Sequence, residues 1–456
     1  MTGFFFNEAL LPGGWARNVR VTMDKSGRIE RCEIDTSAHA GDIRHTNALP
    51  GMANLHSHAF QRGMAGLAER RGTSDDSFWT WREVMYAFND HLTPDDVEAI
   101  AALVYCEMLE SGFTSVGEFH YLHHDRDGSP FADLAEMAGR ICAAAETTGI
   151  ALTLLPVFYR WSGFGDQPAH EGQRRFFNDP DRYARLSDAS LAHTSKLRHG
   201  RLGVAPHSLR AANLEDLRWL AGLRPDDPVH IHIAEQLREV AECEAAHGKR
   251  PVQLLAESVE LDPRWCLVHA THIDAAETRD LARSGAIAGL CPLTEANLGD
   301  GVFPAPDYRA QAGQWGIGSD SHIRIDLAEE LRLLEYGQRL TLRQRNVLAE
   351  PDQHVGRALY QSCATGGAQA LGQPTGRIEI GARADFVVLD SKAPVLAGRS
   401  SDTLLDSWLF SGDGRQVETV YVGGERVVEA GSCLARDMIS GRYCDRLTQL
   451  MQRINA

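Results

Sequence analysis

The sequence has few features that would favour a membrane or a nucleic acid as its partner. None of its apolar runs reaches the roughly 18–20 residues that a membrane helix needs. Its formal net charge is −16, with 46 Lys and Arg against 62 Asp and Glu, and nucleic acids and anionic membranes repel such a surplus. We therefore expect no nucleic-acid partner and no membrane association.

The cysteines indicate neither a disulfide framework nor a zinc ribbon. There are nine of them, an odd number, and they are scattered without a CxxC pair. The opening stretch MTGFFFNEALLPGG has no basic segment, and Glu8 interrupts its apolar run, so we expect no signal peptide. These features together predict a reduced, cytoplasmic protein.

Eight short apolar runs alternate with longer amphipathic segments in the middle of the chain. The runs are residues 50–58, 113–121, 151–160, 202–208, 229–236, 265–273, 286–295 and 315–322. Apolar runs of this length, without strict alternation, are typical of parallel strands that helices cover on the outside. The pattern therefore predicts strands joined by helical connections.

One of the connecting segments, residues 93–112, shows clear helix signals. Thr93 is a typical N-cap, Pro94 occupies the first helical position, Asp96 follows three residues after the cap, and Gly112 ends the segment. Eight strand–helix units predict an α/β fold of the (β/α)8, TIM-type barrel class. No GxGxxG follows the first run, which argues against an open dinucleotide-binding sheet.

Both ends of the chain differ from this pattern. Residues 1–49 and 373–456 hold short strand-like pieces interrupted by Gly and Asp, and the last twenty or so residues are typical of a surface helix. We expect the two ends to form one small β-sandwich beside a catalytic barrel of residues 50–372. The length of 456 residues suits one large domain and a smaller one.

Histidines and carboxylates gather where the predicted strands end. His56 and His58 are two residues apart and therefore point to the same side of the first strand. His232 and Asp320 follow two other runs, and the carboxyl ends of barrel strands meet at one face. Three imidazoles and a carboxylate predict a metal site, which suits Zn²⁺ best and leaves iron(II) open.

The scarcity of lysine bears on how many metal ions this site holds. A two-metal site in such a barrel usually needs a bridging ligand from the fourth strand, often a carboxylated lysine. The sequence has four lysines, none of them at the end of a predicted barrel strand: Lys25, Lys196, Lys249 and Lys392. We therefore expect one metal ion per subunit.

Several of these segments resemble the amidohydrolase superfamily over nearly the whole chain. They are PGMANLHSH, HIHIAE, LVHATH, GSDS and GRIEIGARADFVVLD. A second group resembles the bacterial formimidoylglutamate deiminases within that superfamily: HSHAFQRGMAG, SFWTWREVMY, VGEFHYLHH, VAPHSLR and GSDSHIRIDLAEELRLLEYGQRL. This resemblance implies hydrolysis of N-formimino-L-glutamate to N-formyl-L-glutamate and ammonia, in histidine degradation. It also implies a homodimer.

The resemblance implies three catalytic side chains around the metal, whose role is to lower the pKa of the attacking water. Asp320 would accept the proton of that water, and His269 would hold or polarise the attacking oxygen. Glu235, three residues after the ligand His232, would carry a proton to the imino nitrogen so that ammonia leaves. A plain surface carboxylate at a helix start is the alternative for Glu235.

A dicarboxylate substrate requires fixed cations, and arginine pairs a carboxylate with two parallel hydrogen bonds. We expect Arg82, within FWTWRE, and Arg210, just beyond the fourth run, to bind the two carboxylates. Tyr121 and His207 would add hydrogen bonds, and Gln61 would contact the formimino or amide part. The aromatic residues around Arg82 are equally consistent with a lid or an interface.

Other functions stay open on the sequence alone. The nearest is an aminohydrolase acting on a purine or on an S-adenosylhomocysteine-type substrate, which would need stacking aromatics rather than paired arginines. Ring opening by an imidazolonepropionase-like enzyme is a second alternative. A non-catalytic scaffold of the same fold is a third, and the presence of the whole set of metal ligands argues against it.

Overall fold

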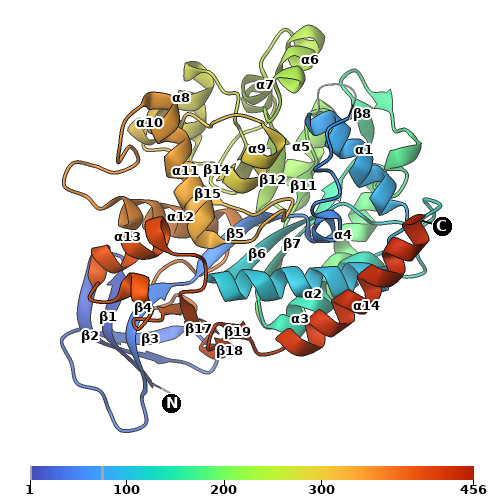
Figure 1. Cartoon of the computed structure of the whole chain (residues 1–456). Helices are drawn as coiled ribbons and strands as arrows, with labels where there is room; N and C mark the ends of the chain where they lie inside the picture. Colours follow the sequence, from blue (N-terminus) through green and yellow to red (C-terminus); the bar gives the residue numbers. More distant parts are fainter. Residues whose placement is uncertain (1–2, 73–76, 456) are drawn as a thin grey trace.

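A computed structural model describes residues 3–72 and 77–455. Its centre is a ring of parallel strands surrounded by helices (Figure 1). The strands are β5 (Met52–Ser57), β6 (Phe113–His120), β7 (Ala151–Phe158), β10 (Gly200–Leu202), β11 (Ala205–Pro206), β12 (Val229–Ile233), β13 (Trp265–His269), β14 (Ile287–Leu290) and β15 (Gln314–Ile317). Each predicted run overlaps one of these strands, except the fourth, which overlaps both β10 and β11, and the eighth is a strand only as far as Ile317.

Isolated bridges close the ring. The strands pair in parallel as β5–β6–β7–β10, with β11 also on β7, and as β12–β13–β14–β15. Parallel bridges join the two sets on both sides, Ser57 to Asp320 on one and Ser208 to His232 on the other. This arrangement confirms the predicted (β/α)8 barrel.

Several predicted strands differ in their limits from the observed ones, and the fourth and seventh show why. The fourth run is interrupted at Gly203, where a Cβ would come within 2.8 Å of the Pro228 carbonyl oxygen, so the two pieces pack closely on the next strand. The seventh run, residues 286–295, is a strand only to Leu290. Pro292 then begins helix α9 (Pro292–Leu298), because its missing N–H is harmless in the first helical turn.

Helices surround the barrel strands, and the signals in residues 93–112 located one of them correctly. Helix α2 (Pro94–Ser111) begins after Thr93, whose side chain accepts from the Asp96 N–H, and it ends at Gly112 with φ of 104°. The other helices around the barrel are α3 (Glu136–Thr148), α4 (Pro180–Thr194), α5 (Leu214–Leu223), α6 (Leu237–His247), α7 (Pro251–Ser258), α8 (Ala275–Ser284), α10 (Ala305–Ala310), α11 (Leu327–Leu342) and α12 (Val355–Leu371).

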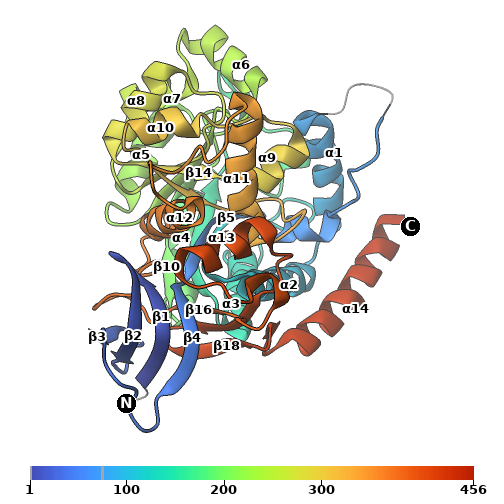
Figure 2. The ribbon, with the colours of Figure 1, turned by 60° about the vertical axis from the view of Figure 1, so that its left-hand side comes forward.

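Strands from both chain ends form one eight-stranded sheet, in the order β19-β18-β17-β16-β4-β1-β2-β3 (Figure 2). Their bounds are β1 (Gly3–Leu11), β2 (Gly14–Met23), β3 (Ile29–Glu33), β4 (Ile43–Pro50), β16 (Phe386–Leu389), β17 (Val417–Val422), β18 (Glu425–Glu429) and β19 (Ser432–Cys433). We call this the terminal sheet.

The terminal sheet curls around its own core. The rings of Phe4 on β1 and Tyr421 on β17 are 4.9 Å apart. Two strands lie between β1 and β17, so a flat sheet, with neighbouring strands about 4.8 Å apart, would hold these rings much farther from each other. The ring of Phe386 packs against that of Phe4, with 5.1 Å between their centroids. The expected union of both ends in one β unit is therefore present, whereas domain limits at residues 49 and 373 stay a prediction.

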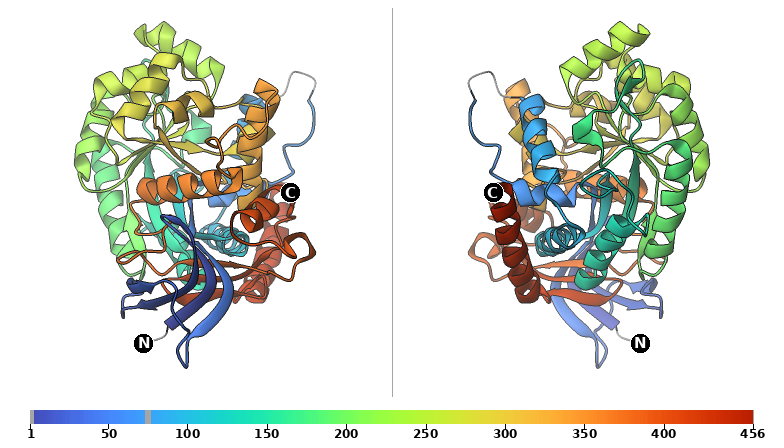
Figure 3. Two further views of the ribbon diagram at one scale, coloured as in Figure 1. Left: turned by 90° about the vertical axis from the view of Figure 1, so that its left-hand side faces the viewer. Right: turned by 90° about the vertical axis from the view of Figure 1, so that its right-hand side faces the viewer.

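The terminal sheet adjoins the amino-terminal ends of β5 and β6 (Figure 3). The Gly51 N–H donates to the Asp385 carbonyl oxygen at 3.1 Å, and Arg383 Nη2 donates to Ser115 Oγ at 2.6 Å. The opposite, carboxyl ends of the barrel strands are therefore left for the connecting loops, which is where chemistry is found in such barrels.

The smaller elements complete the chain, and the last of them is the expected surface helix. Helix α14 (Arg436–Asn455) lies along α2, and Arg446 Nε donates to Asp96 Oδ1 at 2.9 Å (Figure 1). No helix among residues 3–72 and 77–455 is long and apolar enough to cross a membrane. The remaining elements are η1 (Ala59–Met64), α1 (Phe78–Asn89), β8 (Trp161–Gly163), β9 (Gln167–Pro168), η2 (Glu171–Gln173), η3 (Pro394–Leu396) and α13 (Ser401–Ser411).

Candidate active site

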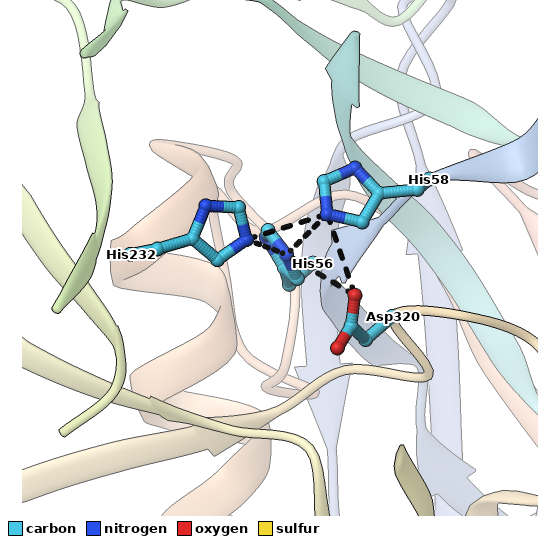
Figure 4. Close-up of side chains that lie close together, drawn as sticks. All are labelled: His56, His58, His232 and Asp320. Atoms are coloured by element: carbon cyan, nitrogen blue, oxygen red, sulfur yellow. Dashed lines mark hydrogen bonds and ion pairs between the residues drawn. The ribbon is translucent and has the colours of Figure 1, made fainter. Parts of the chain in front are cut away.

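Four side chains that can bind a metal meet at the carboxyl ends of β5, β12 and β15. Figure 4 shows the rings of His56, His58 and His232 and the carboxylate of Asp320 pointing toward one another. The three Nε2 atoms lie 3.0–3.3 Å apart, and Asp320 Oδ1 is 3.5 Å from His56 Nε2 and 3.4 Å from His58 Nε2. All four residues are buried, which excludes a solvated surface cluster.

The chemistry of this donor set fits a metal ion. His58 Nδ1–H donates to the Phe119 carbonyl oxygen and His232 Nδ1–H to that of His207, which leaves both Nε2 atoms as lone-pair donors. Burial lowers the pKa of all three imidazoles, so they are held neutral. Ligand atoms about 2.0–2.1 Å from a tetrahedral zinc are about 3.3–3.4 Å apart, close to the separations seen here.

The backbone at these strand ends is strained. Asp320, His269 and Ala234 have φ of 45°, 68° and 51°, a left-handed region that costs residues other than glycine about 1–3 kcal/mol. Main-chain hydrogen bonds hold the arrangement: Asp320 N–H donates to the His56 carbonyl oxygen, and His58 N–H donates to that of Asp320, both at 3.0 Å. Such strain is concentrated at functional sites and aims the side chains at the cluster.

Glu235 and His269 lie beside the cluster as a buried pair. His269 Nε2 is 3.8 Å from Glu235 Oε1 and 3.7 Å from Asp320 Oδ2, and its Nδ1 bonds Glu295 Oε1 at 3.2 Å. Burial opposes a charge on His269, but Glu235 and the Glu295 hydrogen bond raise its pKa. Burial raises the pKa of Glu235. A carboxylic acid whose pKa is raised is suited to giving and taking a proton.

A pocket opens onto this group, and all five predicted substrate-binding residues line it: Gln61, Arg82, Tyr121, His207 and Arg210. Gln61 Nε2–H donates to Tyr121 Oη at 2.8 Å, while Gln61 Oε1 is buried without a partner. In the described part of the chain, neither Arg82 nor Arg210 forms an ion pair, and the Nε of each is buried and unpartnered. Arg210 is buried and Arg82 half-buried, and the charge of Arg210 is balanced only at longer range, by Glu239 and Glu235, which raise its pKa against the effect of burial. Guanidinium groups in a pocket wall without a direct ion pair are available to an anionic ligand.

Comparison with known proteins decides the family. Residues 47–427 match the amidohydrolase family, and residues 1–46 match the N-terminal domain described as formimidoylglutamate deiminase HutF. The chain belongs to the amidohydrolase family. It is 51% identical over 453 residues to a formimidoylglutamate deiminase of Pseudomonas aeruginosa, covering 99% of this chain and 100% of the relative.

Other relatives extend this picture. A solved amidohydrolase from Brucella melitensis superposes with a TM-score of 0.95 at 51% identity, over 99% of this chain and 100% of its own. A 5'-deoxyadenosine deaminase of Methanoregula boonei is 28% identical, over 83% of this chain and 78% of its own. An adenosine deaminase from Xanthomonas campestris, solved with bound zinc, shares the fold at 21% identity and a TM-score of 0.81, covering 100% and 98%.

The sequence analysis did not predict the aromatic side chains that line the pocket beside the metal cluster. They are Phe78, Trp81, Tyr86, Tyr159 and Phe176. The FWTW run did contain the signal, because it supplies Phe78 and Trp81 from α1. Whether this run acts as a lid or an interface stays a prediction.

Trp79 of the same run holds the pocket's arginines, although it does not line the pocket. Its ring lies 4.6 Å from the guanidinium carbon of Arg82, 5.7 Å from that of Arg210 and 4.3 Å from that of Arg238. Guanidinium groups within about 6 Å of an indole face are attracted by its quadrupole. A single side chain on α1 therefore touches three cations from three different segments.

Two buried glutamates brace the site from behind. Glu118 on β6 accepts from Ser57 Oγ at 2.5 Å and from the Ala59 N–H at 2.8 Å, on either side of His58. Glu239 on α6 accepts from the Ala234 N–H at 3.2 Å, next to Glu235. Glu118 lies within the predicted run 113–121, near its end, and this position was the only sequence signal for it. Nothing in the sequence pattern distinguishes Glu239 from the exposed carboxylates of its helix.

Proposed function

We propose that the protein hydrolyses N-formimino-L-glutamate to N-formyl-L-glutamate and ammonia. The observation that carries the proposal concerns Arg82 and Arg210. Neither forms an ion pair among the described residues, and both line the same pocket as the His56–His58–His232–Asp320 cluster. The 51% identity to a formimidoylglutamate deiminase over the full chain, with the matching N-terminal domain, supports the same substrate. Water adds to the formimino carbon, the carbon–nitrogen bond to the imino group breaks, and ammonia leaves.

The metal in this proposal is one Zn²⁺ per subunit, held by His56, His58, His232 and Asp320. Imidazole nitrogens and a carboxylate oxygen are ligands that zinc accepts, and iron(II) accepts them as well. When bound, the ion supplies Lewis acidity and lowers the pKa of a water toward 7. Metal analysis of the active protein by plasma emission distinguishes the two metals.

The substrate carboxylates are bound by Arg210 and Arg82. Arg210 is 7% exposed, so a carboxylate that reaches it forms charge-assisted hydrogen bonds in a site with little competing water. Tyr121, His207 and Gln61 line the same pocket, and the unpartnered Gln61 Oε1 is free to accept from a substrate N–H. The substrate is thereby oriented with its formimino carbon toward the cluster.

The proton steps belong to Asp320, His269 and Glu235. Asp320 Oδ2 faces His269 Nε2 at 3.7 Å, so a proton taken from the attacking water lies within reach of the imidazole that polarises the new oxygen. Glu235, whose pKa burial raises, gives one proton to the imino nitrogen. The second proton of the departing ammonia is the one that Asp320 takes from the attacking water, and Glu235 regains its proton from the new hydroxyl group as the carbonyl forms. Glu295 keeps His269 in position through its Nδ1.

The test is ammonia release by the zinc-loaded protein from N-formimino-L-glutamate, with S-adenosylhomocysteine and guanine in parallel. We expect release from the formimino compound alone. Release from a purine alone would contradict the substrate and agree with the 28% identical relatives that are named as deoxyadenosine and S-adenosylhomocysteine deaminases. N-formimino-glycine, which lacks the side-chain carboxylate, is the matched control for the second arginine.

Two further expectations accompany this function. A homodimer and a cytoplasmic location both stay predictions. Sedimentation of the purified protein tests the first, and fractionation of the source cells tests the second.

A further inference from the structure

Two tyrosines in the wall of the substrate pocket take no part in the metal cluster or in the proton steps. Tyr86 belongs to α1, and Tyr159 follows directly after β7. Both are buried, with 7% and 5% of their surfaces exposed. A buried phenol hydroxyl normally finds a hydrogen-bond partner, so the partners of these two show what the hydroxyls can still bind.

The first partner of both hydroxyls is Gln173, a buried residue of η2. Its Oε1 accepts from the His170 N–H at 3.1 Å. Because a backbone N–H can only donate, this bond fixes which end of the amide is the oxygen and directs Nε2 toward the phenols. Nε2 lies 2.7 Å from Tyr159 Oη and 3.5 Å from Tyr86 Oη, and donates to both.

These three side chains hold one proton more than they can share. The two N–H groups of the Gln173 amide go to the two phenol oxygens. A hydrogen bond between Tyr159 and Tyr86 uses one of the two O–H groups. The other O–H has no acceptor in the part of the chain that the structure describes. Burial raises the pKa of Tyr159, so its hydroxyl stays protonated near neutral pH.

The spare hydroxyl proton lies beside the two arginines of the pocket. The guanidinium carbon of Arg82 is 5.6 Å from the centroid of the Tyr86 ring. The charges of Arg210 and Arg82 both act on the Tyr159 hydroxyl and oppose the effect of burial on its pKa. One part of the pocket therefore offers two cations and a hydroxyl donor. A carboxylate, whose two oxygens only accept hydrogen bonds, is a ligand that satisfies all three groups at once.

We propose that Tyr86 and Tyr159 are substrate-binding residues, which together donate one hydrogen bond to a substrate carboxylate beside Arg82 and Arg210. Gln173 is the positioning residue that orients both phenols. This inference rests on the proposed function, because it takes the substrate to be a dicarboxylate. The carboxylates are not the reacting group, so the bond is equally strong in the bound substrate and in the transition state. It should therefore lower KM without changing kcat.

The experiment is steady-state kinetics of the full, zinc-loaded protein with N-formimino-L-glutamate, for the wild type and for the double variant Tyr86→Phe/Tyr159→Phe. We expect KM to rise about tenfold in the double variant, because a hydrogen bond to a charged group is lost, and kcat to stay within about twofold. The inhibition constant of N-formyl-L-glutamate should rise by the same factor, since inhibition by this compound reports binding without reaction.

Further variants separate this role from a purely structural one. Tyr86→Phe and Tyr159→Phe alone should raise KM less than the double variant, because the remaining hydroxyl can still donate. Gln173→Met removes only the amide that orients the phenols and should raise KM about threefold at constant kcat, which tests the inference even if the double variant does not fold. Tyr183→Phe is the matched control: its buried hydroxyl donates to the Pro156 carbonyl oxygen at 2.7 Å, outside the pocket, so KM should not change.

The outcomes distinguish this inference from the proposed function. If the wild type releases ammonia from N-formimino-L-glutamate and the double variant has an unchanged KM, the inference is wrong and the proposed function stands. A fall of kcat at unchanged KM would assign the phenols to the chemical step and overturn the inference as well. If the wild type releases no ammonia from this compound, the proposed function fails, and the inference fails with it.

Discussion

The two ends of the barrel both bury charged residues, but they satisfy them differently. At the amino-terminal end, Asp385 accepts from Arg383 at 2.6–2.9 Å, from Thr375 at 2.6 Å and from the Gly423 N–H at 2.8 Å. At the carboxyl end, Arg210 and Glu235 are also buried. Among the described residues Arg210 has no hydrogen-bonded partner and only longer-range attraction from Glu239 and Glu235, while Glu235 has His269 at 3.8 Å.

This difference separates structure from function. A buried ion pair whose donors and acceptors are all matched serves the fold, here by joining β6 of the barrel to the terminal sheet. A buried charge that the chain leaves unmatched destabilises the free protein and is retained where a ligand or a reaction completes it. The same residue types thus have opposite expected effects when they are replaced.

The largest expected effect belongs to Glu235→Gln at the unsatisfied end. The amide keeps the shape and cannot carry the proton, so kcat should fall about 10²–10⁴-fold while bound zinc stays at the wild-type level. Turnover and metal content measured on the same preparation check this. A nearly normal kcat would remove Glu235 from the proton path.

Asp385→Asn at the satisfied end should lower the free energy of unfolding by about 3–5 kcal/mol, because it leaves Arg383 buried without its counter-charge. Denaturant unfolding measures this, and kcat per folded molecule should not change. A large loss of kcat in the folded fraction would contradict the assignment of this pair to the fold.

The pH dependence of that variant gives a second check. Burial opposes ionisation of Asp385, but Arg383 and the hydrogen bonds of Thr375 and Gly423 hold its pKa below 3.8. A carboxyl whose pKa is lowered by folding contributes stability above its unfolded pKa and loses it as the pH falls through the folded value. The stability difference between wild type and Asp385→Asn should therefore shrink below pH 3.8.

Arg210→Met should show the opposite pattern to Asp385→Asn, with a loss of activity and little change in stability. We expect kcat/KM for the dicarboxylate substrate to fall about 100-fold, since a substrate carboxylate loses a buried, charge-assisted partner. The melting temperature should change little, because among the described residues Arg210 forms no direct ion pair or hydrogen bond, and Glu239 and Glu235 lose only a nearby positive charge. Steady-state kinetics and a thermal melt of one preparation test both parts. Unchanged kinetics would take Arg210 out of the pocket.

Trp79→Leu should have the smallest effect. Loss of the indole leaves Arg82, Arg210 and Arg238 without their common contact, and each such contact contributes about 0.5–2 kcal/mol. KM should rise about threefold to tenfold with little change in kcat, and Trp79→Phe should restore part of the loss. An equal KM in Trp79→Leu and Trp79→Phe would show that the ring face does not hold the arginines.

Local sequence signals were sufficient for the barrel. The caps of α2 and the apolar runs that became β5, β6, β7, β12 and β13 depend on neighbouring residues, which a sequence displays directly. The grouping of His56, His58, His232 and Asp320 also followed, because the carboxyl ends of parallel strands in a closed barrel must meet. The run that became β14 was overextended, since Pro292 was compatible with the end of a strand as well as the start of a helix.

Contacts between distant segments did not follow from the sequence. Trp79 meets Arg238 across 159 positions of chain, and Arg383 meets Ser115 across 268. Glu239 differs from the exposed glutamates of α6 only in the turn that it packs against. Two side chains of the same type can therefore have different roles, because the fold places different residues beside each of them.

The residue pattern thus determined the fold class, the cluster of candidate metal ligands and the two arginines that line the pocket, since periodicity, caps and strand-end chemistry are local properties. The tertiary structure decided which charges are satisfied. Arg383 is paired and Arg210 is not, although both are buried arginines. Whether a buried charge finds its partner depends on the three-dimensional packing of segments that are far apart in the chain.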